Sequence, residues 1–456
     1  MRLLAILALV VLVGAGCGAD ATKGSPPMAP ESGAPPSDAT QATAPTLTPS
    51  SSPTPATTPS STPAPTPTGE VRWDQIGAIP EAVSGEHESA VGFEDGYVVI
   101  HGTSTIQFSP DGGTWTPVRL PLAKGPVLRV GPAATDGMRV LVVGNYTPCR
   151  KAAWDKDRWG PCRGRPISWV SDDGRTWRGS DTWTGPVGPV GQSGSTFGSV
   201  WAVPTGGWDA AQVFDTSDDT DVGFGVGPAL WHSADGITWS LLRAAPTQSD
   251  TYWAADAFWA LADKDGRRVA VEEVTGPDGD VPSDPSAPAP TQGPILSIST
   301  DGRRYERLTD TPDGSMRAGL APLGAGPWVF AGERPVSKSA YQGLAWASED
   351  LVTWTTTVMP VPRGTVGSTV GALGHTATGL VAIGRVNTRG SDRPVSVTWL
   401  SDDGRTWRIA DVGSSDAMDE SVVAHGPAGT LGFGFACSGS DCKKVTTSVW
   451  RLGSVR

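Results

Sequence analysis

Residues 401–407 read SDDGRTW, a stretch that recurs along the chain with small changes. Every copy has a serine, an aspartate two residues later and an aromatic residue four residues after the aspartate. The copies are SPDGGTW at Ser109–Trp115, SDDGRTW at Ser171–Trp177, SADGITW at Ser233–Trp239, STDGRRY at Ser299–Tyr305, SEDLVTW at Ser348–Trp354 and SDDGRTW at Ser401–Trp407. Their final aromatic residues are 49 to 66 residues apart. Six copies at this spacing predict an architecture built from one repeated unit.

Each copy has the chemistry of a hairpin turn. The aspartate can accept hydrogen bonds from backbone N–H groups two residues further on, and glycine can supply a positive φ. The aromatic residue is expected to fix the start of the outgoing strand. The residues predicted to hold the turns are Ser109, Asp111, Trp115, Ser171, Asp173, Trp177, Ser233, Asp235, Trp239, Ser299, Asp301, Tyr305, Ser348, Asp350, Trp354, Ser401, Asp403 and Trp407.

Between the turns the sequence has the pattern of β-strands. Short apolar runs at Tyr97–Ile100, Val140–Val143, Leu380–Ile383 and Leu431–Phe435 are typical of buried strands, and we expect them to be the inner strands of the repeat. No stretch shows a sustained period of 3.6 residues, so little helix is expected. Four copies have a second tryptophan eight residues before the last, at Trp169, Trp231, Trp346 and Trp399. One face of the strand that enters the turn is therefore predicted to be packed.

The two ends of the folded region complement each other. Thr447–Trp450 resembles a strand that enters a turn, but a tryptophan eight residues later would fall at 458, beyond the last residue. Residues 71–76, VRWDQI, resemble an outgoing strand with no turn before it. The simplest account pairs these strands, so that the ring closes with six complete units and one composite unit.

These turns resemble the Asp-box, or BNR, repeat of sialidase-like β-propellers, although they are one residue shorter between the aspartate and the tryptophan. The resemblance covers the folded region only at the turn positions. In that family the turns lie between the third and fourth strands of each blade, away from the active face. The resemblance implies an all-β fold, a seven-bladed β-propeller over residues 70–456, with the strand at 71–76 closing the last blade.

The same resemblance raises the question of sialidase activity. It implies an arginine triad, an Arg-Ile-Pro segment near the start and a Tyr–Glu nucleophile pair. The stretch most similar to Arg-Ile-Pro is Gly77–Pro80, which lacks the arginine. Neither Tyr252 nor Tyr341 has an obvious glutamate partner. Fold analogy alone does not supply an activity. We therefore do not expect a sialidase.

Residues 1–16 have the anatomy of an export signal. Arg2 precedes an apolar run, Leu3–Val13, which is too short to span a bilayer comfortably, and Gly14–Gly16 then leads to Cys17. This resembles the lipobox of bacterial lipoproteins, with Gly14 where that family usually has an aliphatic residue. The resemblance implies that Cys17 is lipidated and that the protein is anchored to the extracytoplasmic face of the cell membrane. The alternative is an ordinary secretory signal.

Residues 17–69 are dominated by proline, threonine, serine and alanine. Such a segment cannot bury enough apolar surface to offset the loss of chain entropy, so we expect it to be disordered. Its prolines favour extended geometry at about 3.1 Å per residue, which suits a stalk between a membrane and a folded domain.

The formal net charge of −12 argues against nucleic acid as a partner, because phosphate binding needs a basic surface. Export makes the close cysteine pairs Cys149/Cys162 and Cys437/Cys442 candidates for disulfide bonds. Metal binding is the alternative for the second pair, but the nearby sequence offers no further ligands. The acidic stretch 215–221 could hold calcium, although a solvated loop is the simpler interpretation. We expect no cofactor and a monomeric protein.

Two sets of residues are candidates for ligand contact. Trp154 and Trp159 lie between Cys149 and Cys162, outside the repeat positions, and could stack on sugars or peptides. Glu88 and Glu420 precede inner strands of neighbouring blades, so paired carboxylates at the channel mouth could perform glycoside hydrolysis. The favoured hypothesis is a non-catalytic scaffold that binds an extracytoplasmic protein or glycan. The alternative is a secreted glycoside hydrolase or lyase.

Overall fold

A computed structural model describes the following residues: 71–82, 89–101, 105–121, 127–146, 165–184, 194–215, 225–243, 255–264, 266–274, 294–301, 304–308, 315–323, 326–337, 340–390, 394–412, 422–438 and 444–454. All of them belong to one compact unit, Pro67–Arg456. These residues form strands and turns and contain no helix, as the sequence predicts.

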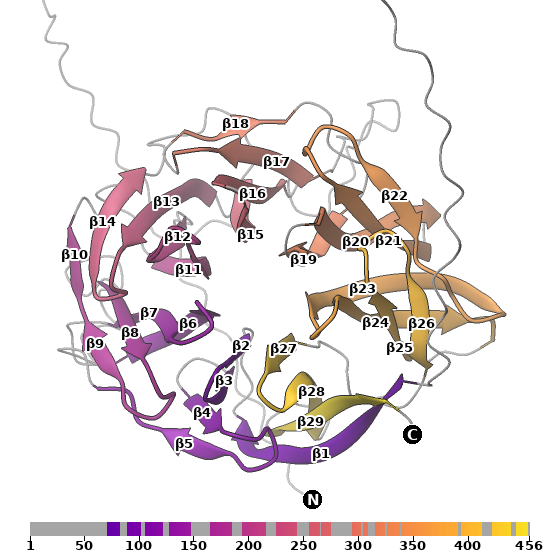
Figure 1. The fold of residues 1–456 in the computed structure, drawn as a ribbon, viewed down its shortest axis with the longest axis horizontal. Coiled ribbons are helices and arrows are strands. Elements are labelled where there is room, and N and C mark those ends of the chain that lie inside the picture. The colour runs from indigo at the N-terminus through magenta and orange to yellow at the C-terminus, as the bar shows by residue number, and fades with distance from the viewer. Residues whose placement is uncertain are drawn as a thin grey trace, which may run out of the picture. The chain divides into compact units, whose positions relative to one another are not determined.

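Seven sheets surround a common centre, and we call them blades 1 to 7 (Figure 1). Blades 1 and 2 contain β2 (Ser89–Phe93), β3 (Gly96–His101), β4 (Thr105–Ser109), β5 (Thr116–Val118), β6 (Val127–Thr135), β7 (Val140–Tyr146), β8 (Arg165–Ser171) and β9 (Arg178–Ser180). Blades 3 and 4 contain β10 (Thr182–Thr184), β11 (Gly194–Ala202), β12 (Trp208–Asp215), β13 (Gly225–Ser233), β14 (Thr238–Arg243), β15 (Ala255–Lys264), β16 (Arg267–Val274), β17 (Pro294–Ser299) and β18 (Glu306–Arg307).

The remaining three blades follow the same plan. They contain β19 (Ser315–Pro322), β20 (Trp328–Ser337), β21 (Ala340–Ser348), β22 (Thr355–Val358), β23 (Thr365–His375), β24 (Leu380–Thr388), β25 (Val395–Ser401), β26 (Arg408–Val412), β27 (Val422–Gly426), β28 (Gly429–Ser438), β29 (Lys444–Ser454) and β1 (Val71–Ala82). Neighbouring strands are antiparallel, except that β10 adds a parallel strand outside β14. The molecule is a seven-bladed β-propeller.

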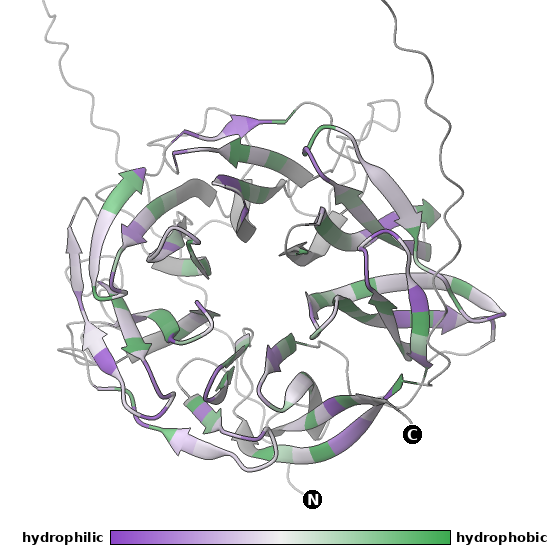
Figure 2. Ribbon diagram, viewed as in Figure 1, coloured by the Kyte–Doolittle hydropathy of each residue, from purple (hydrophilic) through white to green (hydrophobic). Residues whose placement is uncertain are grey.

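The apolar runs expected to form the inner strands form the second strand of their blades instead. Tyr97–Ile100 lies in β3, and Leu380–Ile383 lies in β24, while β2 and β23 lie nearer the centre (Figure 1). A second strand is covered on both faces by neighbouring blades, so its residues can all be apolar. Figure 2 shows apolar residues in strands of every blade, interleaved with polar ones.

Buried indole rings join the blades to the connections between them. Trp169, Trp231, Trp346 and Trp399 are fully buried, which confirms the packing predicted for the strand that enters each turn. The Trp169 indole donates to the carbonyl of Pro121 at 3.0 Å, in the segment that leaves blade 1. The Trp399 indole donates to the carbonyl of Pro360 at 2.6 Å, whereas that of Trp231 donates to Gln212 Oε1 at 3.0 Å.

Blade 7 combines the two ends of the described unit. β1 pairs along β29, from Val71 opposite Ser454 to Ala82 opposite Val445. The strand is longer than the segment 71–76 suggested by the sequence, because Gly77–Ile79 continue the pairing after a register shift. Trp73 is 2% exposed, and its indole donates to Thr398 Oγ1 in β25 of blade 6 at 2.7 Å. The closing strand thus contacts a second blade as well as its own.

Candidate functional site

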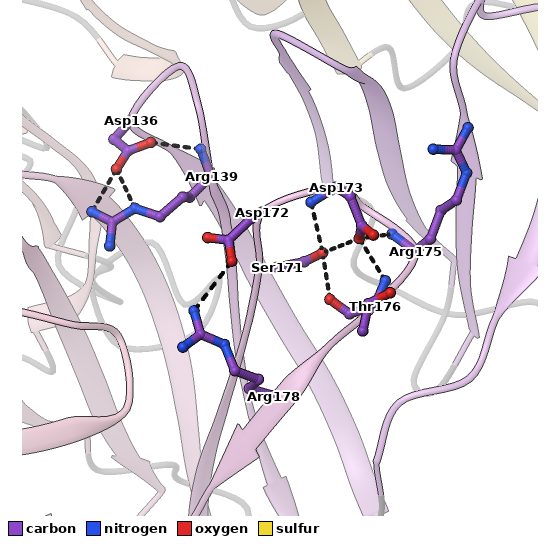
Figure 3. Close-up of polar contacts among 8 residues, drawn as sticks. All are labelled: Asp136, Arg139, Ser171, Asp172, Asp173, Arg175, Thr176 and Arg178. Carbon is purple, nitrogen blue, oxygen red and sulfur yellow. Dashed lines mark hydrogen bonds and ion pairs between the residues drawn. The ribbon is translucent and has the colours of Figure 1, made fainter.

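The six repeated turns lie between the third and fourth strands of blades 1 to 6 and use their carboxylates internally. In blade 2, Ser171 Oγ donates to Asp173 Oδ1 at 3.1 Å (Figure 3). The backbone N–H groups of Arg175 and Thr176 donate to the same oxygen at 2.8 and 2.6 Å. Asp173 therefore stabilises the turn, whereas its neighbour Asp172 forms an exposed ion pair with Arg178.

All six copies have the same serine–aspartate hydrogen bond, with distances of 3.0 to 3.2 Å. The pairs are Ser109–Asp111, Ser171–Asp173, Ser233–Asp235, Ser299–Asp301, Ser348–Asp350 and Ser401–Asp403. The repetition indicates a structural role for these carboxylates, because each is bonded within its own turn.

The same bonds keep the turn carboxylates ionised. The backbone N–H groups of Thr114 and Gly113 lower the pKa of Asp111 below its usual value. The equivalent N–H groups of Thr353 and Val352 lower the pKa of Asp350 to about 2. A carboxylate with such a pKa remains charged near neutral pH and is poorly suited to exchange protons there.

The turns also pack each blade against the preceding one. Gly174 has a φ of 69°, and a Cβ at this position would collide with the Phe108 ring of blade 1. Leu351 takes the equivalent place in blade 5 with a φ of 66°, and it is the only non-glycine residue with a positive φ in the described chain. Its side chain is 1% exposed and packs in a cluster that includes Val269 of blade 4. In blade 5, a leucine side chain therefore occupies the position that is a glycine in the other turns.

Blade 3 departs from the repeat at a buried position. Asp209 lies opposite His232 in the β12–β13 register, and its carboxylate contacts His232 Nδ1 and Arg268 Nη1, each at 2.7 Å. The equivalent pairs in the other five turn-bearing blades are apolar: Val98–Phe108, Leu141–Val170, Val269–Ile298, Val329–Ala347 and Val381–Leu400.

This charged cluster joins two blades, because Arg268 comes from β16 of blade 4. The Asp209 side chain is 1% exposed, so removing either partner would leave a buried charge incompletely compensated. The sequence analysis missed the cluster. Its signal was His232, which precedes the turn serine where the other copies have an apolar residue.

All four predicted contact residues, Trp154, Trp159, Glu88 and Glu420, lie outside the described part of the chain. So do Cys17, Cys149, Cys162, Cys442 and residues 216–221. Cys437 lies in β28, but its side chain is outside the description. The structure does place β2 next to β27, since a Cβ on Gly92 would collide with the carbonyl group of His425. The strands that follow Glu88 and Glu420 are therefore neighbours.

A group of exposed apolar side chains lies over blades 5 and 6. Five of the eight exposed large hydrophobic residues in the described chain belong to it. We call Val336, Tyr341, Val358, Val361 and Val366 the blade 5–6 surface. Their exposed fractions range from 41% to 53%.

These residues lie near the junction of blades 5 and 6, but the strand register places Tyr341 and Val358 on opposite faces of blade 5. Tyr341 lies opposite Pro335, next to Val336, in the β20–β21 register, and Leu344 lies opposite Val358. A Cβ on Gly367, next to Val366, would lie 3.3 Å from the Tyr341 carbonyl oxygen. The first residues of β21 therefore lie between the end of β20, the end of β22 and the start of β23.

Arginines accompany the blade 5–6 surface. Arg334 is exposed and donates from Nη2 and Nε to Gln342 Oε1 at 3.0 and 3.3 Å. Arg363 and Arg389 are also exposed, and the backbone N–H of Arg389 donates to the Gly364 carbonyl at 3.3 Å. The sequence contains no aspartate or glutamate from 351 to 391, although the whole chain has a net charge of −12.

Other kinds of site are not evident in the residues that the structure describes. No group of three or more histidine, cysteine, aspartate or glutamate side chains there could hold a metal ion. Nor does the described chain include an apolar helix long enough to cross a membrane.

Comparisons with known proteins identify similar solved structures but do not assign the chain to a family. No family model matches the chain, and no curated protein matches it. Among solved structures, Trypanosoma rangeli sialidase has a TM-score of 0.43 at 12% identity, covering 71% of this chain and 58% of the sialidase. This chain therefore corresponds to less than two thirds of that protein. An ulvan lyase of family PL25 has a TM-score of 0.46 at 12% identity, covering 84% and 96%. Similarity at this level does not transfer an activity.

Proposed function

We propose that this protein is a non-catalytic scaffold, held at the extracytoplasmic face of a bacterial membrane by a lipid on Cys17, that binds a protein or a glycan. The observation that carries the binding function is the blade 5–6 surface. Its five exposed apolar side chains, on two adjoining blades, are candidates for contact with a partner. The repeated turns support the scaffold role, because their six carboxylates are bonded within the turns.

A secreted glycoside hydrolase or lyase is the second candidate. It is favoured by the adjacency of β2 and β27, the strands that follow Glu88 and Glu420. Two carboxyl groups about 5–10 Å apart can act as an acid and a base or nucleophile at a glycosidic bond. The neighbouring strands are compatible with such a pair.

One experiment separates the two functions. Wild-type protein and the Glu88→Gln/Glu420→Gln variant are incubated with a panel of polysaccharides, and released ends or unsaturated products are measured. The scaffold hypothesis predicts no turnover by either protein. Turnover that the double variant loses would establish the enzyme and refute the non-catalytic scaffold.

A glycan array tests Trp154 and Trp159 as the contact. Trp154→Ala/Trp159→Ala should lose glycan binding, while the matched Trp154→Phe/Trp159→Phe variant should retain most of it, because a phenyl ring still offers an aromatic face. Equal binding by all three proteins would remove this loop from the proposal.

The anchor has its own test. Wild-type protein should partition with membranes and carry a lipid on Cys17, whereas Cys17→Ala should be found in the aqueous fraction. Mass spectrometry of the N-terminal peptide measures the modification. An unmodified Cys17 would favour the ordinary secretory signal. The disulfides Cys149–Cys162 and Cys437–Cys442 remain proposals that peptide mapping without reduction can check.

A further inference from the structure

We infer that the outer edge of β1 is a dimerisation surface, at which it pairs with the same edge of a second copy of this chain. The inference goes beyond the ligand binding proposed above, and either can stand without the other. It also differs from the monomer that we expected from the sequence. It starts from the lengths of the outer strands.

β1 is the outermost strand of blade 7 and is much longer than its counterparts. It has 12 residues, whereas the outermost strands of the other six blades have two to five. Within the described residues β1 pairs only with β29, so its other edge faces outward from the ring (Figure 1). Short edge strands protect a sheet against pairing with other chains, and long ones invite it. Blade 7 therefore offers the longest open edge in the described part of the ring.

The first part of β1 is the regular part. Residues 71–75 pair with β29 residue by residue, and a register shift follows between Gln75 and Gly77. Such a shift bends a strand and interrupts regular pairing, and Pro80 further along lacks an N–H donor. The segment that can accept another strand is therefore residues 71–75, which we call the β1 edge.

The β1 edge has one buried face and one exposed face. Trp73 is 2% exposed, and its bond to Thr398 holds the strand against blade 6. Arg72 and Asp74 lie on the other face, where their side chains are 62% and 57% exposed and form an ion pair at 3.0 Å. The strand is thus fixed in place before it meets a partner, which lowers the entropy lost on pairing.

Charge selects a second copy as the partner and sets the register. In an antiparallel pair centred on Trp73, Arg72 of each copy lies opposite Asp74 of the other. Opposite charges directly across two strands stabilise the pair, and like charges destabilise it. Centring the pair on Arg72 or on Asp74 instead would place two like charges opposite each other. The β1 edge is therefore complementary to itself in this register, and a two-fold axis relates the two copies.

Arg451 extends the alternation of charge across the dimer. It lies opposite Asp74 in the β1–β29 register, so both side chains are on the same face of blade 7. In the dimer, Asp74 would lie between Arg451 on one side and the second copy's Arg72 on the other. Each carboxylate would then have a cation on both neighbouring strands.

Analytical ultracentrifugation of the full-length chain measures the association. Every protein carries Cys17→Ala, so that a lipid cannot contribute. The protein with an unchanged β1 edge should form a reversible dimer that salt weakens, because its ion pairs are exposed. No larger species is expected, since an isologous contact uses the same edge of both copies.

Charge exchange tests the register. Arg72→Asp places two carboxylates across the pair, and Asp74→Arg places two guanidinium groups there. Each should weaken the dimer by about tenfold or more, because both symmetry-related pairs change from attraction to repulsion. Arg72→Asp/Asp74→Arg restores the complementarity in reverse and should dimerise as the unchanged edge does. A mixture of the two single variants should form a heterodimer.

Arg178→Asp is the matched control. Arg178 is also 62% exposed and also pairs with an aspartate, Asp172, but it lies in β9, an outer strand of three residues. Its substitution should change the dissociation constant by less than about twofold. Thermal unfolding should be the same for all variants, because Trp73 and the pairing with β29 are kept.

Three results would overturn the proposal. The first is a monomer at every concentration when the β1 edge is unchanged. The second is a dimer that both single variants leave intact, which would place the contact elsewhere. The third is a double variant that stays monomeric, since the two charges would then not act across the pair. The glycan array measures the ligand binding separately, so each of these results leaves the scaffold function standing.

Discussion

Blades 1 to 6 and blade 7 hold their outer strands in different ways. In the first six, a turn of seven residues joins the third strand to the fourth, and its serine and aspartate satisfy the backbone locally. In blade 7, β1 supplies the outer strand next to β29, from the other end of the folded unit. Local hydrogen bonds are thus replaced by long-range pairing and by the contact of Trp73 with blade 6. The outer strand of blade 7 therefore depends on long-range contacts, whereas those of blades 1 to 6 are also held by local turn bonds.

The largest predicted loss of stability follows from removing the closing strand of blade 7. Deleting Val71–Ala82 removes the partner of β29 and the buried side chains of Trp73 and Ile79. We expect the free energy of unfolding to fall by about 5 kcal/mol or more, since each of these side chains contributes several kcal/mol when buried. Calorimetry measures the change. Deleting residues 18–66 is the control and should leave the melting temperature unchanged.

A single substitution tests the same closure more finely. Trp73→Ala should destabilise the protein by about 3–5 kcal/mol, because it leaves a cavity next to Val381 and Leu400 and removes the bond to Thr398. Trp73→Phe keeps a ring but loses the N–H donor, so about 1–2 kcal/mol is expected. Urea unfolding provides the values. A loss below 1 kcal/mol for the alanine variant would contradict the role of Trp73.

The next prediction concerns the exceptional turn of blade 5. Leu351→Gly relieves a left-handed conformation worth about 1–2 kcal/mol but removes a buried leucine worth about 2–5 kcal/mol. A net loss of about 1–3 kcal/mol is therefore expected. Gly404→Leu is the converse change in blade 6, where a Cβ would collide with Val329, and it should also destabilise. A more stable Leu351→Gly protein would show that strain dominates at this turn.

Removing one turn carboxylate should have a smaller effect. Asp403 Oδ1 accepts from the backbone N–H groups of Arg405 and Thr406 at 2.8 and 2.6 Å. Asp403→Ala should cost about 1–2 kcal/mol, comparable to the loss of a helix N-cap. The neighbouring Asp402→Ala is a matched control, because Asp402 is exposed and the turn bonds are made by Asp403. Equal stability of the two variants would contradict the local role of the carboxylate.

Acid should weaken the turns but leave the strand pairing of blade 7 intact. The pKa of Asp111 is lowered, and that of Asp350 is about 2, so folding favours their ionised forms. Their contribution is present above the unfolded pKa of about 3.9 and is lost as pH falls from about 5 toward 2. We expect a small decrease in the midpoint of urea unfolding over this range. Asp111→Asn should flatten the decrease.

The sequence predicted the scaffold because the scaffold is repetitive. Ser401–Trp407 and its copies mark six blades, and the strand patterns at 71–76 and Thr447–Trp450 indicate the composite one. The expected position of Tyr97–Ile100 was wrong, because a continuous apolar run reports burial on both faces rather than nearness to the channel.

The functional surfaces were harder to predict because they depend on register and exposure. Asp209 contacts His232 and Arg268 only once β12, β13 and β16 are aligned across two blades. Valine is typical of buried strand positions, yet Val336 and Val366 are both exposed.

The pairing of β1 with β29 has a consequence for the order of events during synthesis. Val71 is synthesised before the six turn-bearing blades, and its partner Ser454 is synthesised after them. β1 therefore remains without its partner until β29 has been made, and β27 to β29 then complete the ring with it. A chain stopped before β29 would leave two open edges that invite pairing with other chains. Closure of the ring therefore depends on the synthesis of β29.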